Sequence, residues 1–330
     1  MEEKFHKTFS IEETTNIIDF FLENGYVAIR DVLTEDECNR TLDEINEQMK
    51  KLNLLFDMND ISTYEMAPIV NNYGMYVKKP IFSTQFLLNR QNEKVRKAFS
   101  ILYGDEKLLV SHDRCAFYMP TKNLLINGTY IDKPHWKTHY VFPSLHLDFY
   151  PPTYFNYEKM VEKRETLNYE DTCDFICENN LYSITDGLQI QAVINLKDNY
   201  EEDGGFQCVP TFPNQFNKWC IDKKFESDKI DATKIGVYHF ENINKIDMKY
   251  VSKPIRVPVP KGTIILWSQL MAHGTQPNNS DRGRCIQFIK MFPKRIYSET
   301  RLKHRSAVLR KIFKSINFVP SKTGRSVFNI

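Results

Sequence analysis

His146 and Asp148, separated by one residue, form the part of the sequence best suited to chemistry. Alternate side chains of an extended strand point to the same face, so the imidazole and the carboxylate would lie side by side. Together they offer a metal ion one neutral nitrogen donor and one anionic oxygen donor. Alone the pattern is weak, because a histidine near an aspartate on a strand is more often a hydrogen-bonded pair than a ligand set.

A second segment, Trp267–Asn278, lies far downstream and supplies one more histidine, His273. A basic run that contains Arg282 and Arg284 follows it, and Arg284 stands eleven residues after the histidine. Two histidines and one carboxylate on one side of a metal form the facial triad of non-haem Fe(II) oxygenases, which leaves the opposite positions open. An arginine behind them would suit an anionic co-substrate. We therefore predict that the two histidines and the aspartate bind a metal and form the catalytic centre.

Three blocks of the sequence resemble the phytanoyl-CoA dioxygenase family of Fe(II)- and 2-oxoglutarate-dependent oxygenases. They are Phe20–Leu33, His146–Asp148 and Lys261–Arg284, and together they extend over roughly residues 15 to 292. The first looks like the family's opening element, the second like its proximal ligands and the third like its distal block. The resemblance implies a protein that is mainly β with flanking helices, built on a double-stranded β-helix core of the jelly-roll, cupin-like kind.

The resemblance also implies the cofactors, which are Fe(II), 2-oxoglutarate as co-substrate, and O₂. 2-Oxoglutarate would take two open metal positions and O₂ the third, and a substrate C–H would be hydroxylated with release of succinate and CO₂. Related halogenases lack the carboxylate ligand, so the presence of Asp148 favours hydroxylation. The substrate is expected to be a small molecule, and the sequence leaves its identity and the oligomeric state open.

Two further residues match family positions that hold 2-oxoglutarate. Arg284 stands where the family places the arginine for the distal carboxylate, and a planar guanidinium binds a carboxylate through two parallel hydrogen bonds. Arg282 is the alternative, because Gly283 between the two arginines makes the strand register uncertain. Thr275 matches the hydroxyl that supports the same carboxylate, although an ordinary turn residue is the other interpretation.

The segment 188–196 alternates between apolar and polar residues and is predicted to be a strand. Its polar face carries Gln191 and Asn195. In an isolated sheet that face would be exposed to solvent, whereas in a small barrel it could line the pocket and bind a ligand. These two residues are weaker candidates for contact with the co-substrate or the substrate.

The elements that must position these residues are predicted to form one domain, residues 1–330. An N-terminal elaboration covers 1–105, the jelly-roll core 106–292, and a basic helical tail 293–330. Two insertions, 151–182 and 211–255, interrupt the core, and their contents show no clear period.

Capping-box patterns at Ser10–Glu13 and Thr34–Glu37 each predict the start of a helix. Gly25 is a plausible stop for the first helix. Residues 92–102 suit a short helix, and 55–90 a loop or lid.

Charge is distributed unevenly along the chain. The net charge is +2, but residues 290–330 contain eleven Lys and Arg residues and one acid, Glu299. An amphipathic helix is expected over 299–317, packed outside the barrel. Its basic face is either solvated or a surface for nucleic acid or another acidic partner.

Composition places the chain among soluble globular proteins, with 42% hydrophobic and 26% charged residues. No apolar run reaches the length of a membrane span, and neither a secretory start nor a C-terminal peroxisomal signal is seen, so a cytoplasmic location is expected. The seven scattered cysteines suggest reduced thiols.

Phosphate-binding, dinucleotide-binding and serine-hydrolase motifs are all absent from the sequence. Two alternatives to a small-molecule oxygenase remain. One is a non-catalytic jelly-roll protein that binds a ligand, and the other is an oxygenase that acts on a nucleic acid or protein through the basic tail.

Overall fold

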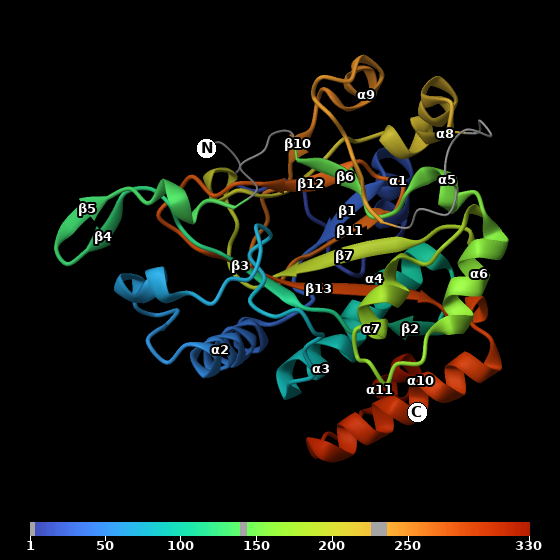
Figure 1. Ribbon diagram of the computed structural model, residues 1–330, viewed down its shortest axis with the longest axis horizontal. Helices are drawn as coiled ribbons and strands as arrows, with labels where there is room; N and C mark the ends of the chain where they lie inside the picture. The colour runs from blue at the N-terminus through green and yellow to red at the C-terminus, as the bar shows by residue number, and fades with distance from the viewer. Residues whose placement is uncertain (1–3, 139–143, 226–235) are drawn as a thin grey trace.

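Two antiparallel β-sheets stack at the centre of a computed structural model that describes residues 4–138, 144–225 and 236–330 (Figure 1). The larger sheet has six strands in the order β1-β11-β7-β13-β2, and β3 also pairs with β13. Its strands are β1 (Tyr26–Ile29), β2 (Leu108–Val110), β3 (Cys115–Tyr118), β7 (Ile190–Asn195), β11 (Ile264–Ser268) and β13 (Arg284–Pro293).

The smaller sheet has five strands in the order β10-β8-β12-β6-β9. They are β6 (Leu145–Leu147), β8 (Gly205–Cys208), β9 (Tyr238–His239), β10 (Ile255–Arg256) and β12 (His273–Gln276). Buried side chains from both sheets pack together in the space between the sheets. They include Val193 and Ile286 from the larger sheet and Phe206 from the smaller. A separate hairpin, β4 (Leu124–Ile126) with β5 (Thr129–Ile131), projects from one end of the molecule (Figure 1).

Strands β6, β7 and β8 alternate between the smaller and the larger sheet, and so do β11, β12 and β13, whereas β9 and β10 both belong to the smaller sheet. This crossing makes neighbours of strands that are distant in the sequence. His146 lies directly opposite His273 on the pair β6–β12, and Gln191 lies directly opposite Trp267 on the pair β7–β11. The crossing thereby brings the predicted ligands together.

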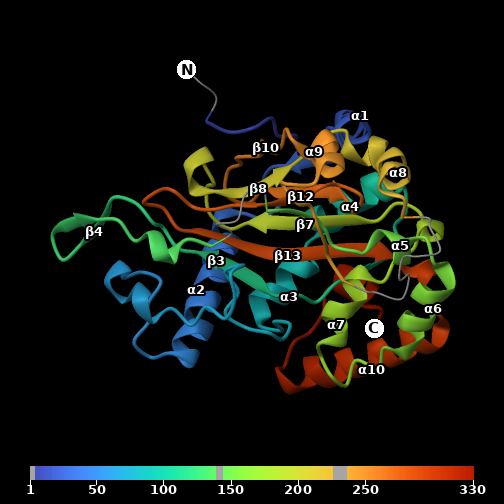
Figure 2. The same cartoon turned by 45° about the horizontal axis from the view of Figure 1, so that its top comes forward.

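Helices cover the outer face of each sheet, so the molecule has four layers (Figure 2). Apolar residues of the N-terminal and C-terminal helices share one core with the outward side chains of β7, β11 and β13. These helices are α1 (Thr14–Asn24), α2 (Glu35–Leu52), α3 (Thr84–Arg90), α4 (Glu93–Tyr103), α10 (Glu299–Ser315) and α11 (Lys322–Phe328). Because the larger sheet is covered on both faces, every residue of β7 is buried, including its polar ones.

The described residues of both insertions contain helices. The first contains α5 (Pro151–Tyr154), α6 (Tyr157–Thr166) and α7 (Asp174–Cys177), and the second contains α8 (Phe212–Lys223) and α9 (Lys245–Val251) besides β9. The aromatic residues of α5, α8 and α9 pack against Leu145 and Leu147 of β6 in a core of their own. Short 3₁₀ turns complete the chain: η1 (Ile61–Met66), η2 (Pro134–Trp136), η3 (Glu178–Asn180), η4 (Ile184–Asp186), η5 (Glu201–Asp203) and η6 (Lys294–Ile296).

The expectation of a mainly β protein is wrong, because 41% of the chain is helical and 18% is strand. The additional helical residues lie in the two insertions and in η1 and α3. These last two elements lie within residues 55–90, which were expected to be a loop or lid. The helices predicted from caps and periodicity are confirmed. Thr34 and Glu37 form the predicted capping box of α2, Gly25 ends α1 with φ of 75°, and α4 and α10 lie where they were expected.

One predicted helix start is displaced. Ser10 and Glu13 do interact, through a hydrogen bond of 2.6 Å from the Ser10 backbone N–H to the Glu13 carboxylate, but α1 begins only at Thr14. All seven cysteines lie in the described part of the chain, and none forms a disulfide. Within the same residues, no helix has both the length and the apolar character required to cross a bilayer.

Candidate metal centre

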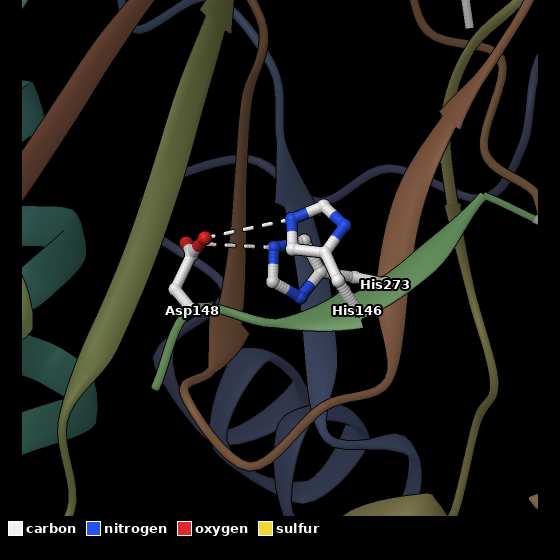
Figure 3. A group of neighbouring side chains, drawn as sticks. All are labelled: His146, Asp148 and His273. Atoms are coloured by element: carbon white, nitrogen blue, oxygen red, sulfur yellow. Dashed lines mark ion pairs between the residues drawn. The ribbon is translucent and has the colours of Figure 1, made fainter. Parts of the chain in front are cut away.

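Three side chains meet where β6 and β12 pair: His146 in the middle of β6, Asp148 just after it, and His273 at the start of β12 (Figure 3). One ligand atom from each lies within 4.8 Å of the others. His146 Nε2 is 3.5 Å from Asp148 Oδ1, and His273 Nε2 is 3.7 Å from Asp148 Oδ2. The cross-strand register therefore converts two distant sequence motifs into one cluster of two nitrogens and a carboxylate.

The His273 ring is fixed in orientation by its own backbone. Its Nδ1 lies 2.9 Å from the carbonyl oxygen of Met271, which can only accept a hydrogen bond, so Nδ1 carries the proton. Burial lowers the pKa of His273 and keeps the ring neutral. Nε2 is thus left as a lone-pair donor that faces Asp148, as a metal ligand requires.

Asp148 is surrounded by hydrogen-bond donors. The side-chain amide of Gln191 donates to Asp148 Oδ2 at 2.6 Å, and the Lys290 ammonium lies 4.0 Å from the same oxygen. Burial by itself would raise the pKa of Asp148, but its contacts with the His146 and His273 rings and the charge of Lys290 hold it well below its ordinary value. The carboxylate is therefore ionised near neutral pH and can act as an anionic ligand.

The cluster opens into a cavity of about 370 Å³. β13 supplies one wall, with Arg284, Ile286, Phe288 and Lys290 as alternate residues of a single strand face. The first and last of these are six residues apart, which corresponds to about 20 Å along a strand. A cation thus lies at each end of this wall.

Arg284 is buried, and its guanidinium stacks over the Tyr118 ring at 4.7 Å from the ring centre. Its Nε and Nη1 atoms have no hydrogen-bond acceptor within the part of the chain that the structure describes. Burial lowers the pKa of Arg284, but a guanidinium remains charged in proteins. Thr275 lines the same cavity. A buried cation with unused donors beside a hydroxyl is suited to an anionic ligand.

Arg282 and Asn195 do not line this cavity. Arg282 is exposed and forms an ion pair with Asp203 at 2.8 Å. Asn195 is fully buried, and neither atom of its amide has a hydrogen-bond partner in the described residues. Gln191 does line the cavity, and the contact it makes there is with Asp148.

Sequence reasoning missed Lys290 and His239. Lys290 donates hydrogen bonds to the Asn179 carbonyl and the Asn180 side chain at 3.1 and 2.8 Å, and its place on the cavity face follows from strand periodicity once Arg284 is assigned. His239 lies directly opposite His146 on β9, and the two ring centres are 5.9 Å apart. Its insertion has no periodic pattern, so only the strand register reveals it.

No protein-family model matches the chain. "Putative phytanoyl-CoA dioxygenase" of Dictyostelium discoideum is 37% identical over 337 residues, which cover 95% of this chain and 90% of that protein. "Ava biosynthesis cluster protein O" of Aspergillus versicolor is 23% identical, over 86% of this chain and 79% of its own length.

Among solved structures, GlcNAc Inducible Gene 2, GIG2 (DUF1479), from Candida albicans matches with a TM-score of 0.56 at 16% identity. The match covers 94% of this chain and 70% of that one, and it shows a shared fold.

Proposed function

Since this chain belongs to the phytanoyl-CoA dioxygenase family, we propose that it is an Fe(II)- and 2-oxoglutarate-dependent dioxygenase. It hydroxylates a small-molecule substrate and releases succinate and CO₂. In this proposal residues 1–330 form one domain. The two sheets form a double-stranded β-helix, which the alternation of β6, β7 and β8, and of β11, β12 and β13, between the sheets supports.

One observation carries the proposal: His146, Asp148 and His273 converge in the same cavity that contains the buried Arg284. Two imidazole nitrogens and one carboxylate match the donor set that non-haem Fe(II) prefers. The unpaired donors of Arg284 match the distal carboxylate of 2-oxoglutarate. The residues therefore fit both groups.

Iron bound at this site would supply activation of O₂, coupled to decarboxylation of 2-oxoglutarate. The protein's own part is to bind and orient. Arg284, supported by Thr275, would hold the distal carboxylate of the co-substrate. The cavity of about 370 Å³ is within the range of small-molecule sites, which favours a small substrate over a polymer.

The basic tail is partly used inside the protein. Arg305 forms a buried ion pair with Glu178, and Arg301 lies 3.6 Å from Glu165. Action on a nucleic acid or protein through the tail is therefore supported only by the remaining exposed cations. A non-catalytic binding protein would bind 2-oxoglutarate in air without forming succinate, and an oxygenase would form it.

The metal and co-substrate assignments can be tested without knowledge of the substrate. Fe(II) and 2-oxoglutarate added without oxygen should give a weak visible charge-transfer band, because 2-oxoglutarate chelates the metal through two atoms. His146→Ala and Asp148→Ala should abolish the band. Arg284→Ala should keep it but require about 10-fold to 100-fold more 2-oxoglutarate, as expected for loss of a charged hydrogen-bonded pair.

Arg282→Ala is the matched control and should behave like the wild type, because Arg282 is exposed and lies outside the cavity. A full band in His146→Ala would refute the ligand set. Equal effects of the two arginine substitutions would refute the assignment of Arg284.

A further inference from the structure

A hydrogen-bonded chain leads from the wall of the cavity to the carboxylate of the metal centre. The Trp267 indole N–H donates to Gln191 Oε1 at 2.9 Å, and the Gln191 amide donates to Asp148 Oδ2 at 2.6 Å. We propose that Trp267 and Gln191 are positioning residues that hold Asp148 in the orientation in which it binds the metal. This inference rests on the proposed function.

The chemistry of the three groups gives the chain one direction. An indole N–H can only donate, so the Gln191 oxygen must face Trp267 and the amide NH₂ must face Asp148. Asp148 must then accept, which an ionised carboxylate does. Reversal of the amide would place a donor against a donor and an acceptor against an acceptor, so the orientation of Gln191 follows from Trp267.

The sheets set the geometry of the chain. Trp267 and Gln191 lie directly opposite each other on the antiparallel strands β11 and β7, so their side chains share one face of the larger sheet. Both are almost fully buried, with 5% and 3% exposure, so water competes little with the bond between them. Asp148 follows a strand of the smaller sheet, and the chain therefore connects the two sheets at the metal centre.

A carboxylate held in this way has little rotational freedom. Oδ2 accepts from Gln191, while Oδ1 lies 3.5 Å from His146 Nε2. Lys290 adds attraction to Oδ2 at 4.0 Å, which is too long for a hydrogen bond. Because the group is oriented before metal arrives, less conformational entropy is lost on binding. Partners that orient metal ligands typically contribute 10-fold to 100-fold in metal affinity.

The experiment titrates anaerobic protein with Co(II) and records the dissociation constant and the visible d–d spectrum. Gln191→Leu removes the donor to Asp148, and Trp267→Phe keeps a ring in place but removes the indole N–H. Each should weaken Co(II) binding by about 10-fold or more and shift the d–d bands. Trp219→Phe is the matched control, because it removes an equivalent indole bond to Asp247, away from the site, and should leave both readouts unchanged.

The double variant Trp267→Phe/Gln191→Leu tests whether the two residues act in series, through one hydrogen-bonded chain, or independently. If Trp267 acts through Gln191, the double variant should bind Co(II) no more weakly than Gln191→Leu alone. If the two residues act independently, the losses of affinity in the two single variants should multiply.

Three results overturn the inference. The first is wild-type Co(II) affinity in both single variants, and the second is multiplicative loss in the double variant. The third is a raised 2-oxoglutarate requirement in Gln191→Leu with unchanged metal affinity, which would make Gln191 a co-substrate contact. Absence of Co(II) binding by the wild type would overturn the proposed function together with this inference.

Discussion

Gly205 lies against the arginine assigned to 2-oxoglutarate. It has φ of 112°, and a Cβ atom built on it would lie 2.8 Å from Arg284 Nε and 2.5 Å from Asn199 Oδ1. Real Cβ atoms do not approach other atoms so closely, so any side chain here must displace the guanidinium or the amide. The backbone at position 205 is therefore part of the cradle that aims Arg284 into the cavity.

Gly205→Ala should accordingly raise the 2-oxoglutarate concentration needed for the charge-transfer band by about 10-fold or more, because the charged pair with Arg284 would be misplaced. Co(II) affinity should change much less, since the metal ligands are not touched. The backbone conformation adds a stability cost of about 1–2 kcal/mol. Titration of the band with 2-oxoglutarate and of the protein with Co(II) measures both effects.

Gly128→Ala provides the comparison for this substitution. Gly128 has φ of 77°, and its added Cβ would meet no atom within 4 Å, so it shares the backbone cost without the collision. It should leave the 2-oxoglutarate requirement unchanged. If both substitutions raise that requirement equally, Gly205 has no specific effect on Arg284.

At the scale of elements, helix α10 is attached to the core by a buried ion pair. Arg305 donates three hydrogen bonds of 2.9–3.2 Å to the carboxylate of Glu178, and one of 2.6 Å to the Val110 carbonyl. Both charged side chains are fully buried. Tyr169 donates a further hydrogen bond to Glu178. The helix that gives the tail its positive charge therefore places one cation inside the protein.

Arg305→Ala should lower the free energy of unfolding by about 3–5 kcal/mol, because it leaves a buried carboxylate without its cation. Arg310→Ala, an exposed position of the same helix, should change it by less than about 0.5 kcal/mol. Urea denaturation of the three proteins measures these values.

The deficit of Arg305→Ala should depend on pH. Burial raises the pKa of Glu178 above its ordinary value even with Arg305 present, and loss of the cation raises it further. A carboxyl group whose folded pKa exceeds its unfolded value contributes stability at low pH and loses it as pH rises through the folded pKa. The deficit should therefore shrink as pH falls toward the ordinary carboxyl pKa. A deficit that grows on acidification would contradict this account.

At the scale of the whole molecule, the second insertion forms a small aromatic core around one acid. Asp247 is fully buried and accepts hydrogen bonds from the Trp219 indole at 3.0 Å and the Tyr238 hydroxyl at 2.9 Å. Lys223 lies 3.2 Å from the same carboxylate. The acid thus joins α8, β9 and α9.

Asp247→Ala should destabilise the protein by about 2–4 kcal/mol, since it leaves a buried indole, a hydroxyl and a nearby ammonium without their acceptor. Asp222→Ala, in the same insertion, removes a more exposed carboxylate that pairs with Lys249 and should cost less than about 1 kcal/mol. Thermal unfolding of both variants tests the difference. Equal losses would mean that Asp247 does not organise the insertion.

The helices of the two insertions could not be predicted from the sequence. α6 buries only Met160 and Arg164, and α9 is organised by Asp247, so neither presents the apolar stripe by which helices are identified. In contrast, α2, α4 and α10 have caps and apolar faces and were predicted.

Some residues of the candidate site could be predicted from the sequence and others could not. The pairing of His146 with Asp148, and Arg284 as a cavity cation, follow from local spacing together with the family pattern. The contacts of Gln191 and Lys290 depend on the register between strands that are distant in the sequence, and no hairpin turn fixes that register.

The short pairing of β9 with β6 has a consequence for the wall of the cavity. Among the described residues, the outer edge of the strand that carries His146 pairs with Tyr238 and His239, which belong to the second insertion. Val237 and His239 also line the cavity. Replacement of this segment would remodel the cavity wall while β6 and β12, which carry His146 and His273, stay unchanged.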